Sequence, residues 1–255
     1  MTSWRPLVGS LLSALFAPPC AVCECVLDQP LAGAVCERCW GTIVASPATF
    51  QSNGLITAAG AIGEYDGMLR EIIHALKYQG RRSTASRLAA LMAERGAPIL
   101  AGADAVVPVP LHSRRERERG FNQASELARG LSLPVLHVLR RSRSTRPQVE
   151  LPAAERHRNV KDAFEVVGRS KDRIGRSEDR PLRTLSEWVR RGRSLDRPDR
   201  SDRSDRPDVS GKILVLVDDV TTTGATLEAC ARVLKAAGAA EVRALTAARV
   251  ASVPR

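Results

Sequence analysis

Short apolar runs alternate along the chain with longer amphipathic stretches. Ile213–Val217 holds five consecutive apolar residues, most of them β-branched, which predicts a strand buried on both faces. Asp104–Pro110 predicts a second strand that ends in a proline-stiffened turn, and Pro134–Leu139 predicts a third. We also expect a short strand within the small-residue segment 46–63.

Apolar residues recur at helical spacing in four other segments. Met68–Tyr78 has an apolar face and is followed by Gly80, a common stop signal for a helix. Further helices are predicted for Arg87–Arg95, for Phe121–Leu131 and for the stretch from Leu227 onward. Alternating strands and helices predict an α/β fold, a parallel sheet flanked by helices.

The residues after the strand at 213–217 suggest a binding site. Asp218 and Asp219 follow the strand directly, and the hydroxyl- and glycine-rich turn Thr221–Thr226 leads into the last predicted helix. The N–H groups of such a turn and the helix dipole can hold a phosphate, and the carboxylates can accept hydrogen bonds from ribose hydroxyls. In an open α/β sheet this turn would lie where ligands bind. The pattern indicates a phosphorylated sugar, and the P-loop sequence is absent from this turn.

Five of the six cysteines lie in the first forty residues. Cys20, Cys23, Cys36 and Cys39 form two C-x-x-C pairs, and their spacing suits one tetrahedral zinc ion, as in a zinc ribbon. The alternative is a redox or disulfide pair, which the lack of a convincing export signal disfavours. We predict structural Zn²⁺, because so small an element needs its metal to fold. Cys25 is a surplus thiol beside these four.

The net charge of +11 is concentrated in two segments. Residues 168–210 hold 13 basic and 9 acidic residues, and residues 112–158 hold 11 basic and 5 acidic residues. Such an excess suits either a polyanion or a small substrate with several phosphates. The aromatic content of 4% argues against a stacking platform for single-stranded nucleic acid.

Composition also predicts the domain organisation. We expect a lead-in helix and zinc ribbon in residues 1–45, and the α/β domain in residues 55–167 and 211–252. Residues 168–210 predict a disordered polyampholyte insertion with at most one short helix, because repeated Asp-Arg-Ser/Pro units have too little apolar content to offset the ordering entropy. No apolar run is long enough for a membrane span, and residues 7–17 make a poor signal peptide, so we expect a cytoplasmic protein.

The stretch from Ile213 to Thr226 resembles the 5-phosphoribosyl-1-pyrophosphate (PRPP) motif of type I phosphoribosyltransferases. The resemblance implies that Asp218 and Asp219 contact the ribose. It implies that the 5′-phosphate is held by Thr222, Thr223, Gly224, Ala225 and Thr226. Transfer chemistry on PRPP also needs a pyrophosphate site, with Mg²⁺ bound together with the substrate.

In type I enzymes a loop after an early strand supplies the pyrophosphate site, and Pro108–Arg115 is the matching segment here. Arg114, Arg115 and Arg119 suit a polyphosphate because guanidinium is planar and always charged. The run R-R-E-R-E-R could equally be a solvated helix face whose charges pair with one another.

Three other residues are candidates for the reaction. Lys77 could reach the pyrophosphate, although a lysine at a helix end is more often solvated. Residues 140–150 would form a mobile flap, from which Arg146 would stabilise the departing pyrophosphate. Among the histidines we single out only His112, which lies beside the predicted pyrophosphate loop.

Three sequence blocks narrow the resemblance to the ComF family. They are V-P-V-P-L-H-S-R-R-E-R-E-R-G-F-N-Q-A, T-R-P-Q and R-H-R-N-V-K-D-A-F. The resemblance implies a four-cysteine zinc element joined to a phosphoribosyltransferase-type domain, and a role in DNA uptake for some members. Two functions stay open. One is an enzyme that displaces pyrophosphate from PRPP with Asp218, Asp219 and Arg146. The other is a non-catalytic PRPP sensor or DNA-uptake adaptor that uses the zinc ribbon as a docking surface, with single-stranded DNA or DNA-uptake proteins as partners.

Overall fold

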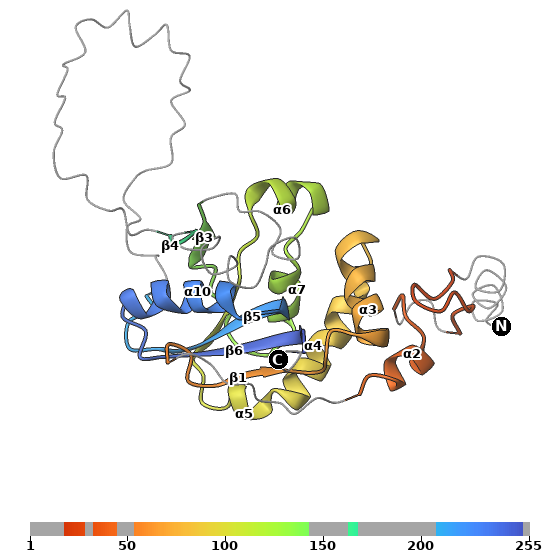
Figure 1. The fold of residues 1–255 in the computed structure, drawn as a ribbon, viewed down its shortest axis with the longest axis horizontal. Coiled ribbons are helices and arrows are strands. Elements are labelled where there is room, and N and C mark those ends of the chain that lie inside the picture. Colours follow the sequence, from red (N-terminus) through yellow and green to blue (C-terminus); the bar gives the residue numbers. More distant parts are fainter. Residues whose placement is uncertain (1–17, 29–32, 45–53, 143–162, 168–207, 252–255) are drawn as a thin grey trace, which may run out of the picture.

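A computed structural model describes residues 18–28, 33–44, 54–142, 163–167 and 208–251. Its centre is a four-stranded parallel sheet with the order β1-β6-β5-β2 (Figure 1). A separate antiparallel pair, β3 and β4, lies beside it. The strands are β1 (Ala59–Ala61), β2 (Ala105–Pro108), β3 (Leu139–Arg141), β4 (Phe164–Val166), β5 (Ile213–Thr221) and β6 (Glu241–Arg249).

Helices cover both faces of the sheet. Alternate residues of a strand point to opposite faces, so strands that are apolar throughout need cover on both sides. In β5, Leu214 and Leu216 pack in a cluster with residues of α10, whereas Val215 and Val217 pack with residues of α3, α4 and α7. The α/β class is therefore confirmed. The helices are α2 (Glu37–Gly41), α3 (Gly67–Tyr78), α4 (Ser83–Arg95), α5 (Ala97–Leu100), α6 (Ser113–Arg119), α7 (Gln123–Arg129) and α10 (Ala225–Ala236).

The four predicted helices are present, with α4 starting earlier than expected and α7 shorter at both ends. Two strand predictions need correction. The strand from Ile213 does not end at Val217 but runs to Thr221, because β6 continues to pair with it past the acidic residues. The segment Pro134–Leu139 forms only one parallel bridge, between Val135 and Val106, and the regular strand there is β3.

Several predicted features lie outside the described residues. They are the lead-in helix at 7–17, most of the insertion at 168–210 and most of the flap at 140–150. Within the part of the chain that is described, no helix combines the length and apolarity that a bilayer crossing requires.

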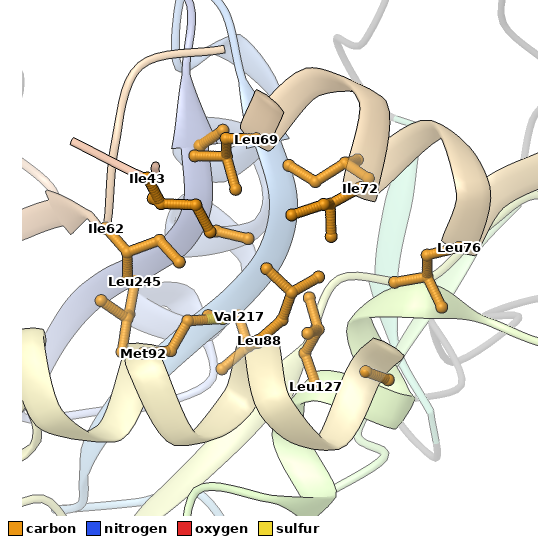
Figure 2. Close-up of a cluster of buried hydrophobic side chains, with 14 of the residues drawn as sticks. Ile43, Ile62, Leu69, Ile72, Leu76, Leu88, Met92, Leu127, Val217 and Leu245 are labelled. Carbon is orange, nitrogen blue, oxygen red and sulfur yellow. The ribbon is translucent and has the colours of Figure 1, made fainter. Parts of the chain in front are cut away.

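The larger part of the core lies between α3, α4 and the sheet. Figure 2 shows the apolar face of α3 meeting α4 and the two central strands. The side chains labelled there are Ile43, Ile62, Leu69, Ile72, Leu76, Leu88, Met92, Leu127, Val217 and Leu245. This packing fixes the position of α3 on the sheet, and α3 ends at the candidate site described below.

Helix α4 passes very close to the end of α7 at Gly130. A Cβ atom on Gly130 would lie 2.5 Å from the Cβ atom of Ala89, which is fully buried. We expect Gly130→Ala to lower the free energy of unfolding by about 1–3 kcal/mol in urea denaturation, because two packed backbones would have to separate. Adding Ala89→Gly should return part of the loss, although a helical glycine itself costs about 1 kcal/mol. A double variant no more stable than Gly130→Ala would contradict this explanation.

Candidate functional site

A cavity of about 850 Å³ lies where β2 and β5 end. Four segments distant in the sequence form most of its lining, and Tyr65 and Val250 complete it. The four segments are the C-terminal end of α3, the stretch from Val109 to Gln123, Arg141 of β3, and residues from Asp218 to Thr226. This is the position that parallel α/β sheets use for ligands.

The acidic pair lies on the floor of this cavity and has a buried cationic partner. Nζ of Lys77, at the end of α3, is 3.0 Å from Oδ2 of Asp219, and the two side chains are only 13% and 12% exposed. Burial by itself would lower the pKa of Lys77, but the charge of Asp219 and the hydrogen bond to it outweigh burial, so the pKa of Lys77 is raised. Lys77 is therefore charged, and it is not the solvated helix-end lysine that the sequence favoured.

Asp218 is the carboxylate of the pair for which the described residues provide no direct ion pair. Its Oδ1 accepts a hydrogen bond of 2.8 Å from the backbone N–H of Asp219. Burial and the neighbouring charge of Asp219 raise the pKa of Asp218 to about 7. Below a pH of about 7 the carboxyl group of Asp218 therefore carries a proton, which a ligand with positive charge or hydroxyl donors would displace.

This raised pKa predicts a pH-dependent stability. The pKa of Asp218 is 3.8 in an unperturbed chain and about 7 in the fold, so between these values the folded protein binds the extra proton. The contribution of Asp218 to stability is then largest near pH 4 and falls as the pH rises toward 7. We expect Asp218→Asn to gain stability relative to the wild type across this window, measured by urea denaturation from pH 4 to pH 8. A constant difference between the two proteins would contradict the raised pKa.

The turn after β5 has the features of a phosphate site. Gly224, at φ 77°, is in the left-handed conformation directly before α10, a conformation that favours glycine. Thr222 and Thr226 line the cavity. Within the described structure, the Oγ1 atom of Thr223 is buried and has no hydrogen-bond partner, so a donor is available next to the helix N-terminus. The N–H groups of the first helical turn have no partners within a helix.

Helix α6 divides its arginines between two environments. Arg115 and Arg119 are partly buried and line the cavity. Arg114 is exposed, is not part of the cavity lining, and pairs through Nε with Oε1 of Glu118 at 2.9 Å. Arg114 thus has the exposed, self-paired position of the second interpretation, whereas for Arg115 and Arg119 polyphosphate binding stays a prediction.

Arg119 is held at the edge of the cavity by two neighbours. Its Nη1 donates to Oε1 of Gln123 at 2.9 Å, and its Nη2 donates to the hydroxyl of Tyr78 at 3.3 Å. The guanidinium also lies 5.0 Å from the centroid of the Tyr78 ring. Tyr78, Gln123 and Tyr65 line the cavity as well, and the sequence did not single out any of them as ligand contacts.

Arg141 is a further cavity residue that the sequence did not single out, and its guanidinium group suits an anion. Its guanidinium lies 5.3 Å from the centroid of the Phe164 ring, across the β3–β4 pair. Burial and the positive charge of Arg115 lower the pKa of Arg141, so the two guanidinium groups are close enough for their charges to repel. Two arginines placed in this way favour an anion between them. Arg146, predicted from the same arginine-rich run, lies outside the described residues.

His112 and Asn122 both have structural contacts here. Nδ1 of His112 accepts a hydrogen bond of 3.2 Å from the backbone N–H of Arg114, which caps the start of α6. Asn122 caps α7 by accepting from the N–H of Ala124, and its amide donates to the carbonyl of Val109. Asn122 therefore holds the start of α7 at the rim of the cavity, and His112 has a capping role that the sequence did not suggest.

The four predicted metal ligands come together at the N-terminal side of the fold. The Sγ atoms of Cys20, Cys23, Cys36 and Cys39 all lie within 4.8 Å of one another. Cys20 and Cys39 are 3.9 Å apart, and Cys23 and Cys36 are 3.6 Å apart. Tetrahedral Zn–S bonds of about 2.3 Å require sulfur separations of about 3.8 Å, so this all-thiol set fits a zinc ion.

Two residues beside the cluster affect its exposed side. The Sγ atom of Cys25 lies 3.3 Å from that of Cys23, and Nη2 of Arg38 lies 3.7 Å from Cys23 Sγ. Hydrogen bonds from the backbone and side chain of Cys25 and from Arg38 lower the pKa of Cys23 to about 5. Cys23 is therefore a thiolate at neutral pH, the form that binds metals.

Residues 117–253 match the family model described as the phosphoribosyl transferase domain. The α/β domain and its cavity therefore define the chain as a protein of the phosphoribosyltransferase class. DNA utilization protein YhgH of Escherichia coli K12 is 31% identical over 231 residues, which cover 86% of this chain and 80% of that protein. The chain belongs to the ComF family of competence proteins.

Two other relatives carry competence names. Competence protein ComFC of Bacillus subtilis is 27% identical over 217 residues, covering 84% of this chain and 71% of that protein. Competence protein F of Haemophilus influenzae is 29% identical over 145 residues, covering 55% of this chain and 48% of that protein. The sequence resemblance to the ComF family is thus confirmed.

Proposed function

We propose that the cavity binds PRPP. Asp218 and Asp219 would accept hydrogen bonds from the ribose hydroxyls, and the turn 222–226 would hold the 5′-phosphate. Lys77 and Arg115 would contact the pyrophosphate. The observation that carries this proposal is that one cavity brings together an acidic pair, a phosphate turn at a helix N-terminus and several cations from separate segments.

We assign Arg141, rather than Arg114, as the further pyrophosphate ligand. Arg141 lines the cavity close enough to Arg115 for the two charges to interact, whereas Arg114 is exposed and pairs with Glu118. Arg146 remains a candidate from the sequence, as the part of the flap that would approach the leaving group.

The reaction that suits this arrangement is transfer of the phosphoribosyl group to a nucleophile, with nitrogen the favoured attacking atom. A bond forms from the nucleophile to ribose C1, the bond from C1 to the pyrophosphate oxygen breaks, and pyrophosphate leaves with the electron pair. A nitrogen nucleophile loses its proton. Lys77, Arg115 and Arg141 would stabilise the negative charge that grows on the pyrophosphate. The oxygen atoms of Asp218 and Asp219 suit Mg²⁺, which would neutralise further charge on PRPP when bound with it.

Calorimetric titration of the zinc-loaded protein with PRPP and Mg²⁺ tests the binding proposal. We expect saturable binding by the wild type and none by the variant Asp218→Asn/Asp219→Asn, provided the variant keeps its circular dichroism spectrum. Absence of binding by the wild type would refute the proposal. Catalysis has a separate readout, the release of pyrophosphate from PRPP in the presence of a panel of nitrogen nucleophiles.

A second candidate is a PRPP-binding adaptor or sensor without turnover. The names of the relatives, a DNA utilization protein and two competence proteins, favour it, because they refer to DNA use rather than to a transfer reaction. Binding of single-stranded DNA that weakens steeply with salt, together with PRPP binding but no pyrophosphate release, would support this candidate. Pyrophosphate release that depends on Asp219 would favour the enzyme.

A further inference from the structure

The four-cysteine cluster does not have a core of its own. Buried Cys20, Cys39 and Trp40 belong to the same hydrophobic cluster as the inward faces of α3 and α4. Figure 2 shows Ile43, which follows the cysteine-bearing helix α2, near Leu69 at the start of α3. The other face of the sheet, covered by α10, packs in a second cluster, which includes none of the four clustered cysteines.

Gly63 lies between the chain leaving α2 and the first turn of α3 and is close to both. A Cβ atom on Gly63 would lie 2.8 Å from Cδ2 of Leu69, 3.2 Å from the carbonyl oxygen of Val44 and 3.8 Å from Cγ2 of Ile43. No side chain separates the two segments at this point. A displacement of residues 43–44 would therefore disturb the packing around Leu69 at the start of α3.

Two arginines of α4 also connect the cysteine cluster to the sheet domain. Arg87 forms an ion pair with Glu37, and its guanidinium lies 5.1 Å from the centroid of the Trp40 ring. Arg95 donates from Nη1 to the carbonyl of Ile62 at 2.8 Å, next to β1, and from Nη2 to the carbonyl of Ile43 at 3.4 Å. The cysteine cluster is thus bound to both helices on this face.

Helix α3 connects this region to the cavity. Leu69 is in its first turn, beside residues 43–44, and Lys77 is in its last turn, 3.0 Å from Asp219. The residues between them on the same face are fully buried, so the helix is held along its length. The phosphate turn, by contrast, is attached to α10 on the other face of the sheet.

We propose that metal binding at the four cysteines and ligand binding in the cavity are coupled through α3. Bound metal keeps α2 and residues 43–44 against the start of α3, and this packing holds Lys77 over Asp219. Loss of the metal loosens α3, and Lys77 then leaves its position. The ligand is PRPP, so this part rests on the proposed function.

Hydrogen–deuterium exchange of the full-length, ligand-free protein tests the structural half, with and without zinc removal by a chelator. We expect α3 to lose protection through to Lys77 when zinc is removed, and α10 to keep its protection, because the two helices pack in different clusters. Unchanged protection of α3 would overturn the proposal. Equal loss in α3 and α10 would also overturn it, since that result means global unfolding.

The coupling between zinc binding and PRPP binding is tested by measuring PRPP affinity with and without zinc and the rate at which a chelator removes zinc. Coupling between equilibrium affinities is reciprocal, so zinc removal should weaken PRPP binding, and saturating PRPP should tighten zinc binding, by the same factor, expected to be about tenfold. Slower release of zinc to the chelator in the presence of PRPP should accompany the tighter binding. Ribose 5-phosphate should show a smaller effect, because it lacks the pyrophosphate that Lys77 would contact. Equal PRPP affinity of zinc-loaded and zinc-free protein would overturn the coupling.

A point variant avoids any change of the cysteines. Arg87→Gln removes the ion pair with Glu37 and the contact with Trp40, and should speed zinc release several-fold and reduce the effect of PRPP on it. Arg140→Gln is the matched control, because Arg140 forms an exposed ion pair with Glu165 away from the cysteines. Identical zinc release by both variants would count against the proposal.

If zinc-loaded protein does not bind PRPP at all, the proposed function fails, and hydrogen exchange still decides whether the metal holds α3 in place.

Discussion

Replacing Arg115 and Arg141 together with methionine is expected to weaken PRPP binding at least about 100-fold, because a hydrogen bond to a charged group contributes about 1.5–3 kcal/mol and two are lost. Both arginines line the cavity, and burial together with the charge of Arg115 lowers the pKa of Arg141. Methionine keeps much of the apolar contact that Arg141 makes with Phe164, so the fold should survive.

Two comparisons distinguish a loss of pyrophosphate contacts from a general loss of positive charge. The affinity for ribose 5-phosphate should change little in Arg115→Met/Arg141→Met, since the phosphate turn and the acidic pair stay intact. Arg114→Met is the matched control. It removes one positive charge from the same helix, but Arg114 is exposed, lies outside the cavity lining and already pairs with Glu118. Calorimetric titration of all three proteins checks this, and an equal loss of PRPP affinity in Arg114→Met would contradict the assignment.

Lys77→Met should lower the free energy of unfolding by about 3 kcal/mol at neutral pH, because it leaves the carboxylate of Asp219 buried without its cation. Both side chains of this pair are nearly buried, so solvent screens the pair only weakly. Asp219→Asn alone should also destabilise, since it leaves Lys77 charged and unpaired. The double variant should recover much of the loss, because neither charge then remains. Urea denaturation of the four proteins measures the coupling, and additive losses would show that the pair does not interact.

The cost of Lys77→Met should depend on pH. Lys77 is one of the cations that lower the pKa of Asp218, so its removal should move that pKa upward from about 7. A carboxyl group whose folded pKa is raised loses stability as the pH rises toward that value. The destabilisation should therefore be larger at pH 8 than at pH 5, and a loss independent of pH would contradict this account.

The sequence did not predict strand β6 or the full length of β5, because both depend on pairing with neighbouring strands. Strand β6 occupies the centre of the sheet, but its sequence E-V-R-A-L-T-A-A-R is rich in alanine, which does not favour strands on its own. Its residues are buried because β1 and β5 lie on either side and helices cover both faces. The acidic residues after Val217 looked like the end of a strand, yet pairing with β6 extends β5 past them.

By itself the sequence determined the local parts of this protein. The four metal-spaced cysteines, the acidic pair and the phosphate turn are consecutive or closely spaced, so residue type and spacing specify them, and with them the family. Only the tertiary structure decided which distant residues share the cavity. It placed Lys77 against Asp219, turned Arg115 inward and Arg114 outward, and brought Arg141 from β3 to the same site. These choices depend on how α3, α6 and β3 pack on the sheet, because side-chain contacts between distant segments are set by packing and not by local periodicity.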